Sequence, residues 1–231
     1  MALTDDLIAY WSLDEAEGLA RADSVGSLDL AENSIDETGV GGSPGIVNGA
    51  ASFVAVNEEY LSGASTAALQ TGDIDFTIAV WARIDDNTNA YTIWSKWSTA
   101  DSQREYMLDY ASLTQRFRFL VSANGVSNSY VLLDALLTPV AGQWYLLIAW
   151  HDATANKIYI EANGSLQNEA GHSTGVYASS ADMQLGASQN PGYERYLNGM
   201  IDEAGFWKRL LTPAERLALY NAGAGRNYPL A

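Results

Sequence analysis

The segment of residues 197–220 constrains the fold most, because a strand pattern passes directly into the start of a helix. The pair Thr212-Pro213 predicts that start. The threonine can accept a hydrogen bond from a free backbone N–H, and the proline suits the first helical position, where its missing N–H costs nothing. Glu215, three residues after the threonine, completes a capping box. We expect Gly223 and Gly225 to end this short C-terminal helix.

Alternating hydrophobicity predicts that the chain before this segment is mainly β-structure. Residues 143–152 are apolar on both faces, which predicts a central strand covered on both sides. After a strand at 157–162, Asn163-Gly164 can supply the two positive-φ residues of a type I′ turn, and we expect the chain to return at 165–168. In a further strand, alternate side chains are expected to face the core: Phe76, Ile78, Val80, Ala82 and Ile84.

The C-terminal segment resembles the signature of the laminin G-like (LamG) branch of the concanavalin A-like lectin/glucanase superfamily. The residues that carry the resemblance are Gly199, Ile201, Asp202, Glu203, Trp207, Arg209, Leu211, Thr212, Glu215 and Tyr220. Three N-terminal blocks, at 7–18, 23–26 and 45–53, are also similar to that family. The resemblance extends over residues 7–220. It implies an all-β jelly-roll sandwich of two antiparallel sheets with a short C-terminal helix, and the length suits one domain over 1–231.

Charge and composition exclude several classes of function. The chain has 231 residues, 28 acidic against 12 basic, with a net charge of −16, so it repels nucleic acid and anionic lipid. It has no cysteine, which excludes disulfides, thiol nucleophiles and cysteine-type zinc sites. We recognise no signal peptide and no apolar stretch of membrane-spanning length, so we expect no membrane insertion. The expected location is extracellular or on a virion surface.

Catalytic motifs of related enzymes are not recognisable in the sequence. The resemblance implies that β-glucan-cleaving relatives carry Glu-x-Asp-x-x-Glu on one strand, and that spacing does not occur here. The chain also lacks a Gly-x-Ser-x-Gly turn. Of its two histidines, His151 is expected in the core or at its rim and His172 in a solvated loop. We therefore predict that the protein is not an enzyme, and a diverged polysaccharide hydrolase or lyase is the weakest alternative.

A calcium site of structural role is one hypothesis for the rim of the sandwich, because many LamG-like domains hold calcium there. The residues in matching positions are Asp23, Ser24, Gly26 and Asp202, which would offer carboxylate and loop oxygens. The alternative is that Asp23 caps a turn and Asp202 is a buried hydrogen-bond acceptor that joins two strands. The sequence favours neither alternative.

A ligand-binding surface is the second hypothesis, because exposed aromatic rings stack on the apolar faces of sugars while polar side chains bind the hydroxyls. Two loops, at 99–104 and 188–193, combine aromatic and polar residues where a sandwich presents its variable connections. The predicted ligand-binding residues are Trp94, Trp97, Asp101, Arg104, Tyr106, Asn190 and Tyr193; Trp81, Arg83, Lys96 and Tyr196 extend the candidate surface. The alternative is that most of these aromatic side chains belong to the core.

Two functions fit these observations. The first is a non-catalytic recognition or adhesion module that binds a glycan or a protein surface, with or without calcium. The second is a virion structural or capsid-decoration protein, whose partner is another copy of the chain or a capsid protein. A concave aromatic groove would favour the first, and a large apolar patch would favour the second.

Overall fold

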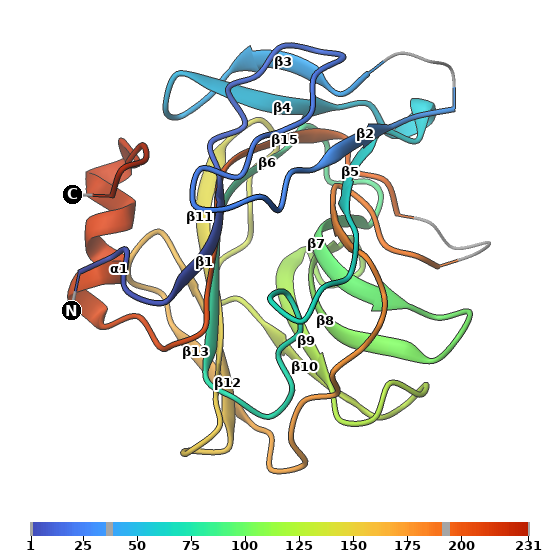
Figure 1. Cartoon of the computed structure of the whole chain (residues 1–231), viewed down its shortest axis with the longest axis vertical. Coiled ribbons are helices and arrows are strands. Elements are labelled where there is room, and N and C mark those ends of the chain that lie inside the picture. Colours follow the sequence, from blue (N-terminus) through green and yellow to red (C-terminus); the bar gives the residue numbers. More distant parts are fainter. Residues whose placement is uncertain (1, 36–38, 191–194, 231) are drawn as a thin grey trace.

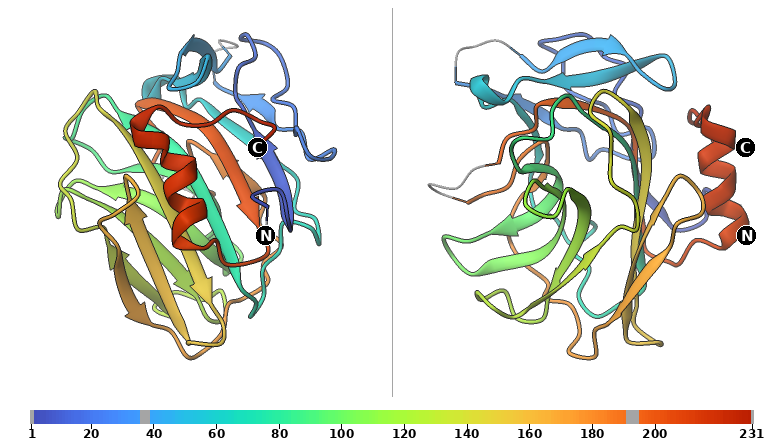
Figure 2. Two further views of the ribbon diagram at one scale, coloured as in Figure 1. Left: turned by 90° about the vertical axis from the view of Figure 1, so that its left-hand side faces the viewer. Right: turned by 180° about the vertical axis from the view of Figure 1, so that it is seen from behind.

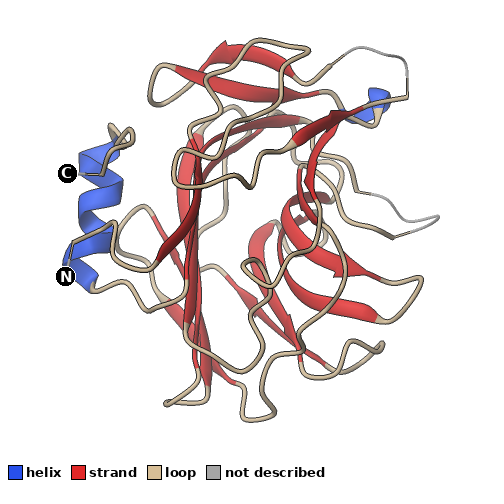
Figure 3. Ribbon diagram, in the orientation of Figure 1, coloured by secondary structure: helices blue, strands red, loops and turns tan. Residues whose placement is uncertain are grey.

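The computed structural model describes residues 2–35, 39–190 and 195–230. Two antiparallel β-sheets lie face to face, and an α-helix packs against the outside of one of them (Figures 1 and 3). The predicted all-β sandwich with a short C-terminal helix is therefore confirmed. In the described part of the chain, no helix is long and apolar enough to cross a membrane.

The first sheet contains eight strands within the described ranges. In spatial order they are β13 (Asn168–Gly171), β12 (Lys157–Ala162), β11 (Trp144–Asp152), β6 (Phe76–Ile84), β15 (Gly199–Trp207), β4 (Gly49–Phe53) and β3 (Gly41–Pro44), and β1 (Leu7–Trp11) also pairs with β15. Strands β11, β6 and β15 form the middle of the sheet.

The second sheet contains seven strands within the same ranges. Their order is β10 (Tyr130–Asp134), β9 (Arg116–Ser122), β8 (Gln103–Ala111), β7 (Tyr91–Ser98), β14 (Met183–Leu185), β5 (Tyr60–Gly63) and β2 (Ala31–Asn33). A short 3₁₀ helix, η1 (Ala55–Asn57), lies between β4 and β5.

The main core fills the space between the two sheets. The first sheet contributes the alternate residues of β6 that the sequence predicts, Phe76 to Ile84, all of them buried. The second sheet contributes its own alternate side chains, including Phe117 and Phe119 of β9. Aromatic rings meet across the gap: Tyr106 of β8 stacks on Phe206 of β15 with 6.4 Å between ring centroids. Burial of this apolar surface holds the sandwich together.

A second core lies on the opposite face of the eight-stranded sheet, beneath helix α1 (Pro213–Tyr220). Figure 2 shows the helix lying across this sheet. Trp81 of β6 stacks on Tyr220, with 5.8 Å between the ring centroids. The guanidinium of Arg216 lies 4.2 Å from the ring centre of Trp150 in β11 and bonds to Glu161 at 2.8 Å. The prediction that β11 is covered on both sides is thus confirmed.

The helix starts as predicted but ends earlier. Thr212 accepts a hydrogen bond from the backbone N–H of Glu215, whose carboxylate accepts one from the N–H of Thr212 in return. The helix ends at Tyr220 because Asn221 adopts a left-handed conformation with φ of 47°. Asparagine tolerates this region better than most residues, so neither Gly223 nor Gly225 is needed to end the helix.

The hairpin after β12 also departs in part from its prediction. Asn163 and Gly164 both have positive φ, at 55° and 69°, as a type I′ turn requires. The returning strand is β13 at Asn168–Gly171 rather than residues 165–168, so the connection is longer than the two-residue turn predicts.

The capping box predicts a measurable contribution of Thr212 to stability. Thr212→Ala removes the acceptor for the Glu215 N–H and should lower the free energy of unfolding by about 1 kcal/mol in urea titration. Thr212→Ser keeps the hydroxyl and should stay close to wild type. Equal stability of the alanine and serine variants would contradict a capping role for this side chain.

Candidate functional site

The outer face of the seven-stranded sheet is the part of the sandwich that helix α1 leaves open (Figures 1 and 2). In β9, Phe117, Phe119 and Val121 face the main core, so Arg118 and Leu120 face outward. Met107 of β8 and Trp97 of β7 lie beside Leu120 in a small apolar cluster separate from both cores. This alternation gives the outer face an apolar centre.

A hollow of about 420 Å³ lies on this outer face, and we call it the sheet-face hollow. Its lining residues are Trp97, Thr99, Arg104, Met107, Arg118, Leu120, Ser127, Asn128, Tyr130, Leu132, Asn190 and Arg195. Trp97 is 4% exposed and makes an edge contact with Tyr130, which is 41% exposed, with 5.6 Å between ring centroids. The volume falls within the range of small-ligand sites.

Three arginines line the sheet-face hollow, and two of them bind the same buried carboxylate. Arg118 of β9 binds both oxygens of Asp109, with Nε 2.8 Å from Oδ1, and Arg195 lies 3.3 Å from Oδ2 of the same residue. Burial acts to lower the pKa of Arg118. Its hydrogen bonds to Asp109 and the negative charge of Asp109 outweigh burial and raise that pKa. Arg104 donates from Nη1 to the carbonyl of Gly125 at 2.8 Å. The guanidinium groups are therefore held at the wall of the hollow.

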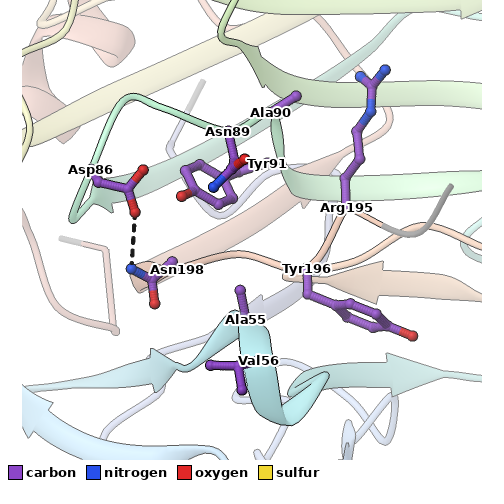
Figure 4. A pocket seen from close by; sticks show the side chains of 9 residues that line it. All are labelled: Ala55, Val56, Asp86, Asn89, Ala90, Tyr91, Arg195, Tyr196 and Asn198. Atoms are coloured by element: carbon purple, nitrogen blue, oxygen red, sulfur yellow. Dashed lines mark hydrogen bonds between the residues drawn. The ribbon is translucent and has the colours of Figure 1, made fainter.

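A second hollow, of about 560 Å³, lies at the edge of the same sheet, and we call it the rim hollow (Figure 4). Ala55 and Val56 of η1 form one side of it, and Tyr91 and Asp86 form another. Asn198 donates to Asp86 Oδ2 at 3.2 Å. Although burial acts to raise it, hydrogen bonds from Tyr91, Thr88 and Asn198 hold the pKa of Asp86 at about 2. The rim hollow thus contains an ionised carboxylate.

The two hollows are neighbours because Arg195 lines both of them. Figure 4 shows its side chain extending away from Asp86 and Asn198, and its contact with Asp109 places its guanidinium at the sheet-face hollow. A smaller hollow of about 220 Å³ continues the surface, sharing Asn190 with the sheet-face hollow and Tyr196 with the rim hollow. Together they form an extended, uneven surface on the open side of the sandwich.

A family model described as the concanavalin A-like lectin/glucanases superfamily, of the laminin G type, matches residues 56–215. The chain belongs to this superfamily. The match covers the strands of both sheets from β5 to β15, including every strand of the sheet-face hollow. A comparison with curated proteins finds no match.

Solved structures of binding domains share the fold at low sequence identity. The binding domain of Paraclostridial Mosquitocidal Protein 1 is similar with a TM-score of 0.72 and 12% identity over 96% of this chain and 53% of that one. The binding domain of botulinum neurotoxin DC, in complex with rat synaptotagmin II, is similar with a TM-score of 0.68 and 14% identity over 94% of this chain and 52% of that one. This chain therefore spans about half the length of those toxin domains.

A third structure is similar over nearly its whole length. It is domain 4 of AbnA, a GH43 extracellular arabinanase from Geobacillus stearothermophilus, in complex with arabinotriose. The TM-score is 0.66 and the identity 17%, over 96% of this chain and 98% of that one. At such identities the likeness to all three structures establishes the fold alone.

The structure brings three of the sequence-predicted ligand-binding residues together: Trp97, Arg104 and Asn190 line the sheet-face hollow. Asp101 lies in the exposed turn between β7 and β8 and is not among the lining residues. Tyr193 lies outside the described residues. Tyr196, from the wider candidate surface, lines the rim hollow.

The prediction was wrong for Trp94 and Tyr106, because both side chains are fully buried in the main core. The register of β7 shifts between Thr92 and Trp94, so Ile93 and Trp94 both enter the core despite being consecutive. Trp81 belongs to the second core. These three positions agree with the alternative that most of the candidate aromatic side chains belong to the core.

Most of the sheet-face hollow was not predicted from the sequence. The lining residues outside the predicted residues and loops are Met107, Arg118, Leu120, Ser127, Asn128, Tyr130, Leu132 and Arg195. A signal was present in β9, where the alternation of Phe117, Phe119 and Val121 assigns Arg118 and Leu120 to the other face. No comparable signal pointed to Arg195, because it lies outside any strand and reaches the site through the tertiary fold.

Asp23 serves as an acceptor for backbone amides. Its Oδ1 accepts N–H groups of Tyr10 and Val25, each at 3.0 Å, and its Oδ2 accepts those of Gly26 and Leu28 at 3.0 and 3.1 Å. The residue is 7% exposed. This is the turn-capping alternative, since four N–H donors already occupy the carboxylate oxygens that a cation would need.

Asp202 is also a buried acceptor. Its Oδ2 accepts backbone N–H groups of Ile46 and Val47 at 2.8 and 3.0 Å, which ties β15 to the β3–β4 turn. Burial raises the pKa of Asp202 to about 7, and the neighbouring carboxyl of Asp14 raises it too. The observed contacts of Asp202 are those of the second alternative, a buried acceptor that joins two segments.

The four residues of the calcium hypothesis therefore do not fit a calcium ligand set. Asp23 and Asp202 have separate backbone partners, and Ser24 and Gly26 belong to the turn that Asp23 caps. In the described ranges, no group of three or more histidine, aspartate or glutamate side chains is placed to hold a metal ion. Calcium binding stays a prediction for experiment.

The two histidines lie against each other, with ring centroids 5.7 Å apart. Nδ1 of His151 is 2.9 Å from the carbonyl of Ile74, and Nε2 of His172 is 2.7 Å from that of Gly175. His151 is in the core as predicted. The prediction for His172 was wrong, because it is only 2% exposed, and this burial lowers its pKa. His151 thus joins β11 to the segment before β6, whereas His172 bonds within its own loop.

The contacts of Asp23 predict a stability effect that does not depend on metal. Asp23→Ala leaves the buried N–H of Tyr10 and three partly buried N–H groups without their acceptor, and should lower the free energy of unfolding by about 2 kcal/mol. Asp101→Ala, which removes an exposed carboxylate, serves as the control and should change little. If Asp23 instead holds calcium, a chelator would lower the melting temperature of the wild type but not of Asp23→Ala.

Asp202 and Glu203 predict a pH dependence of stability. Burial, together with the charges of Asp202 and Asp14, raises the pKa of Glu203 to about 8, although the hydrogen bond from Tyr10 acts to lower it. Because this folded-state pKa lies above the unfolded value, the carboxyl stabilises the fold at low pH, and that stability is lost as the pH rises toward 8. The free energy of unfolding should therefore fall between pH 6.5 and 8, by up to about 1.4 kcal/mol per pH unit for one titrating carboxyl.

Urea unfolding of the wild type and Glu203→Gln at several pH values in this range tests the effect. The amide cannot ionise, so the variant should show a flatter dependence. A wild-type stability that stays constant or rises from pH 6.5 to 8 would contradict neutral carboxyl groups at these positions.

Proposed function

We propose that this chain is a non-catalytic glycan-recognition module that binds its ligand at the sheet-face hollow. The observation that carries the proposal is a hollow of ligand size with an exposed tyrosine beside apolar and hydrogen-bonding side chains, on the side of the sandwich without the helix. The solved complex of AbnA domain 4 with arabinotriose supports it, because that domain matches this chain nearly end to end.

The chemistry of the hollow suits a sugar. Tyr130 and Leu132, which are 41% and 38% exposed, offer apolar surface to the face of a pyranose or furanose ring. Asn190 also lines the hollow, and its side-chain amide is fixed by a hydrogen bond from Nδ2 to the hydroxyl of Ser188 at 2.7 Å. Asn128 and Ser127 add further hydrogen-bonding groups at the wall. Apolar surface and convergent polar groups together are typical of small-ligand sites.

A binding role is favoured over hydrolysis by the lining of the hollow. Retaining and inverting glycosidases use a pair of carboxyl groups that flank the scissile bond. Among the described residues that line the sheet-face hollow, none is an aspartate or glutamate, and the nearby Asp109 is buried and bound to arginine.

A protein surface is an alternative ligand for the same face of the sandwich. The botulinum neurotoxin DC binding domain in complex with rat synaptotagmin II shows that a chain with this fold can be part of a protein complex. We favour a glycan because the hollow is concave and of small-molecule size. Action outside the cell, calcium support and the capsid-decoration alternative stay predictions.

Mutation of Tyr130 tests the proposal. A glycan array should first identify bound oligosaccharides, and calorimetry should then compare the wild type with Tyr130→Ala and Tyr130→Phe. Loss of the ring should weaken binding by about tenfold or more, since stacking contributes roughly 1 kcal/mol or more beyond the hydrogen bonds. The phenylalanine variant keeps the ring and should bind nearly as well as the wild type.

Leu113→Ala is the control for a change remote from the site, because Leu113 is 99% exposed in the turn between β8 and β9. Unchanged melting temperatures would show that all variants fold. Absence of binding to any glycan, or equal affinity of Tyr130→Ala and the wild type, would refute glycan recognition at this hollow.

A further inference from the structure

We propose that the sheet-face hollow selects an acidic saccharide, one whose sugar carries a carboxylate, as uronic and sialic acids do. This inference rests on the proposed function and names its ligand class. The geometry points to a ring placed against Tyr130 and Leu132 with its carboxylate turned toward Arg195, Arg104 and Arg118.

The distribution of charge is the first argument. The chain carries a net charge of −16 and only 12 basic residues, yet three of them line this one hollow. Among the described lining residues, no carboxylate accompanies them. The hollow is therefore a positive region on an acidic protein, which favours an anionic ligand there.

The pairing of the three arginines is the second argument. One carboxylate, Asp109, serves both Arg118 and Arg195 and has no exposed surface of its own. Arg104 has a neutral partner, the carbonyl of Gly125. Asp134 lies opposite Arg118 in the pairing of β9 and β10, and its charge also acts on Arg118. Two negative charges among three positive ones leave an excess of one within the group.

Most of the remaining basic side chains have their own carboxylate. Arg21 is paired with Glu32, Arg209 with Glu215 and Arg216 with Glu161, at 2.7 to 2.8 Å. The excess at the hollow thus differs from the way this chain places its other arginines. Partly buried guanidinium groups without a full set of anionic partners bind a carboxylate more strongly than a hydroxyl.

The exposure of the three groups shows which of them a ligand can reach. The side chain of Arg195 is 41% exposed and that of Arg118 is 17% exposed, whereas the whole residue Arg104 is 9% exposed. Arg195 is bound to Asp109 at only one of its terminal nitrogens, Nη1, at 3.3 Å. We therefore assign the direct contact with the ligand carboxylate to Arg195, with Arg118 fixed behind it by Asp109.

Matched pairs of glycans test the inference. The probes are galacturonic acid and its methyl ester, sialyllactose and lactose, and a disaccharide with one glucuronate and its glucose counterpart, all presented on one array and then measured by calorimetry. In at least one pair, the acidic member should bind about tenfold or more tightly than its neutral partner, because charge-assisted hydrogen bonds are the stronger kind. The difference should shrink as salt rises.

The variant Arg195→Gln tests the direct contact that we assign to Arg195. It should reduce the preference for the acidic member by about fivefold or more, while binding of the neutral member changes little. Arg83→Gln is the matched control, because it removes the same charge from an arginine on the eight-stranded sheet. It should leave the preference unchanged.

The outcomes separate the two proposals. Equal binding of acidic and neutral members, weakened by Tyr130→Ala, would overturn the acidic ligand and leave glycan recognition intact. Binding of sulfated sugars without any carboxylated one would overturn the carboxylate assignment. No binding to any glycan on the array would overturn both proposals together.

Discussion

Burial of both faces of the eight-stranded sheet is the constraint on which the rest of the molecule depends. Strand β6 shows it directly, because Ile78 and Val80 enter the core between the sheets while Ala79 and Trp81 enter the core beneath helix α1. A strand of this kind can have no solvent face, so the helix must cover it. The helix covers one sheet only, so the outer face of the other sheet stays open, and the proposed binding site lies there.

The carboxylates of this acidic chain have two distinct structural roles. Asp23 caps a turn with four backbone N–H groups, and Glu215 caps helix α1 while pairing with Arg209. Hydrogen bonds to Arg209 and Thr212 hold the pKa of Glu215 at about 2, although burial opposes them. Asp202 accepts backbone N–H groups and Glu203 accepts the hydroxyl of Tyr10, and burial raises the pKa values of both. The partners of a carboxyl, more than its burial, decide its charge.

Much of the fold was predictable because its signals are local. The capping box depends on Thr212 and Glu215 alone, and the two-sided hydrophobicity of β11 is visible in its residues. The hollow was less predictable, because its residues come from four strands and three loops. Trp94 was misplaced because a register shift in β7 breaks the alternation from which its direction was inferred. Arg195 could not be found from the sequence, since only tertiary structure brings it to Asp109.

The contrast between a positive hollow and an acidic surface bears on which anions the site can accept. Screening limits charge interactions in water to about 8 Å at physiological ionic strength. A polyanion such as nucleic acid extends well beyond that distance, so it would bring most of its charges against a surface of the same sign. A sugar with one carboxylate places its single charge within the hollow, among arginines that are partly shielded from solvent. The acidic surface would therefore exclude polyanions while the hollow retains a small acidic ligand, which makes the overall charge part of the specificity.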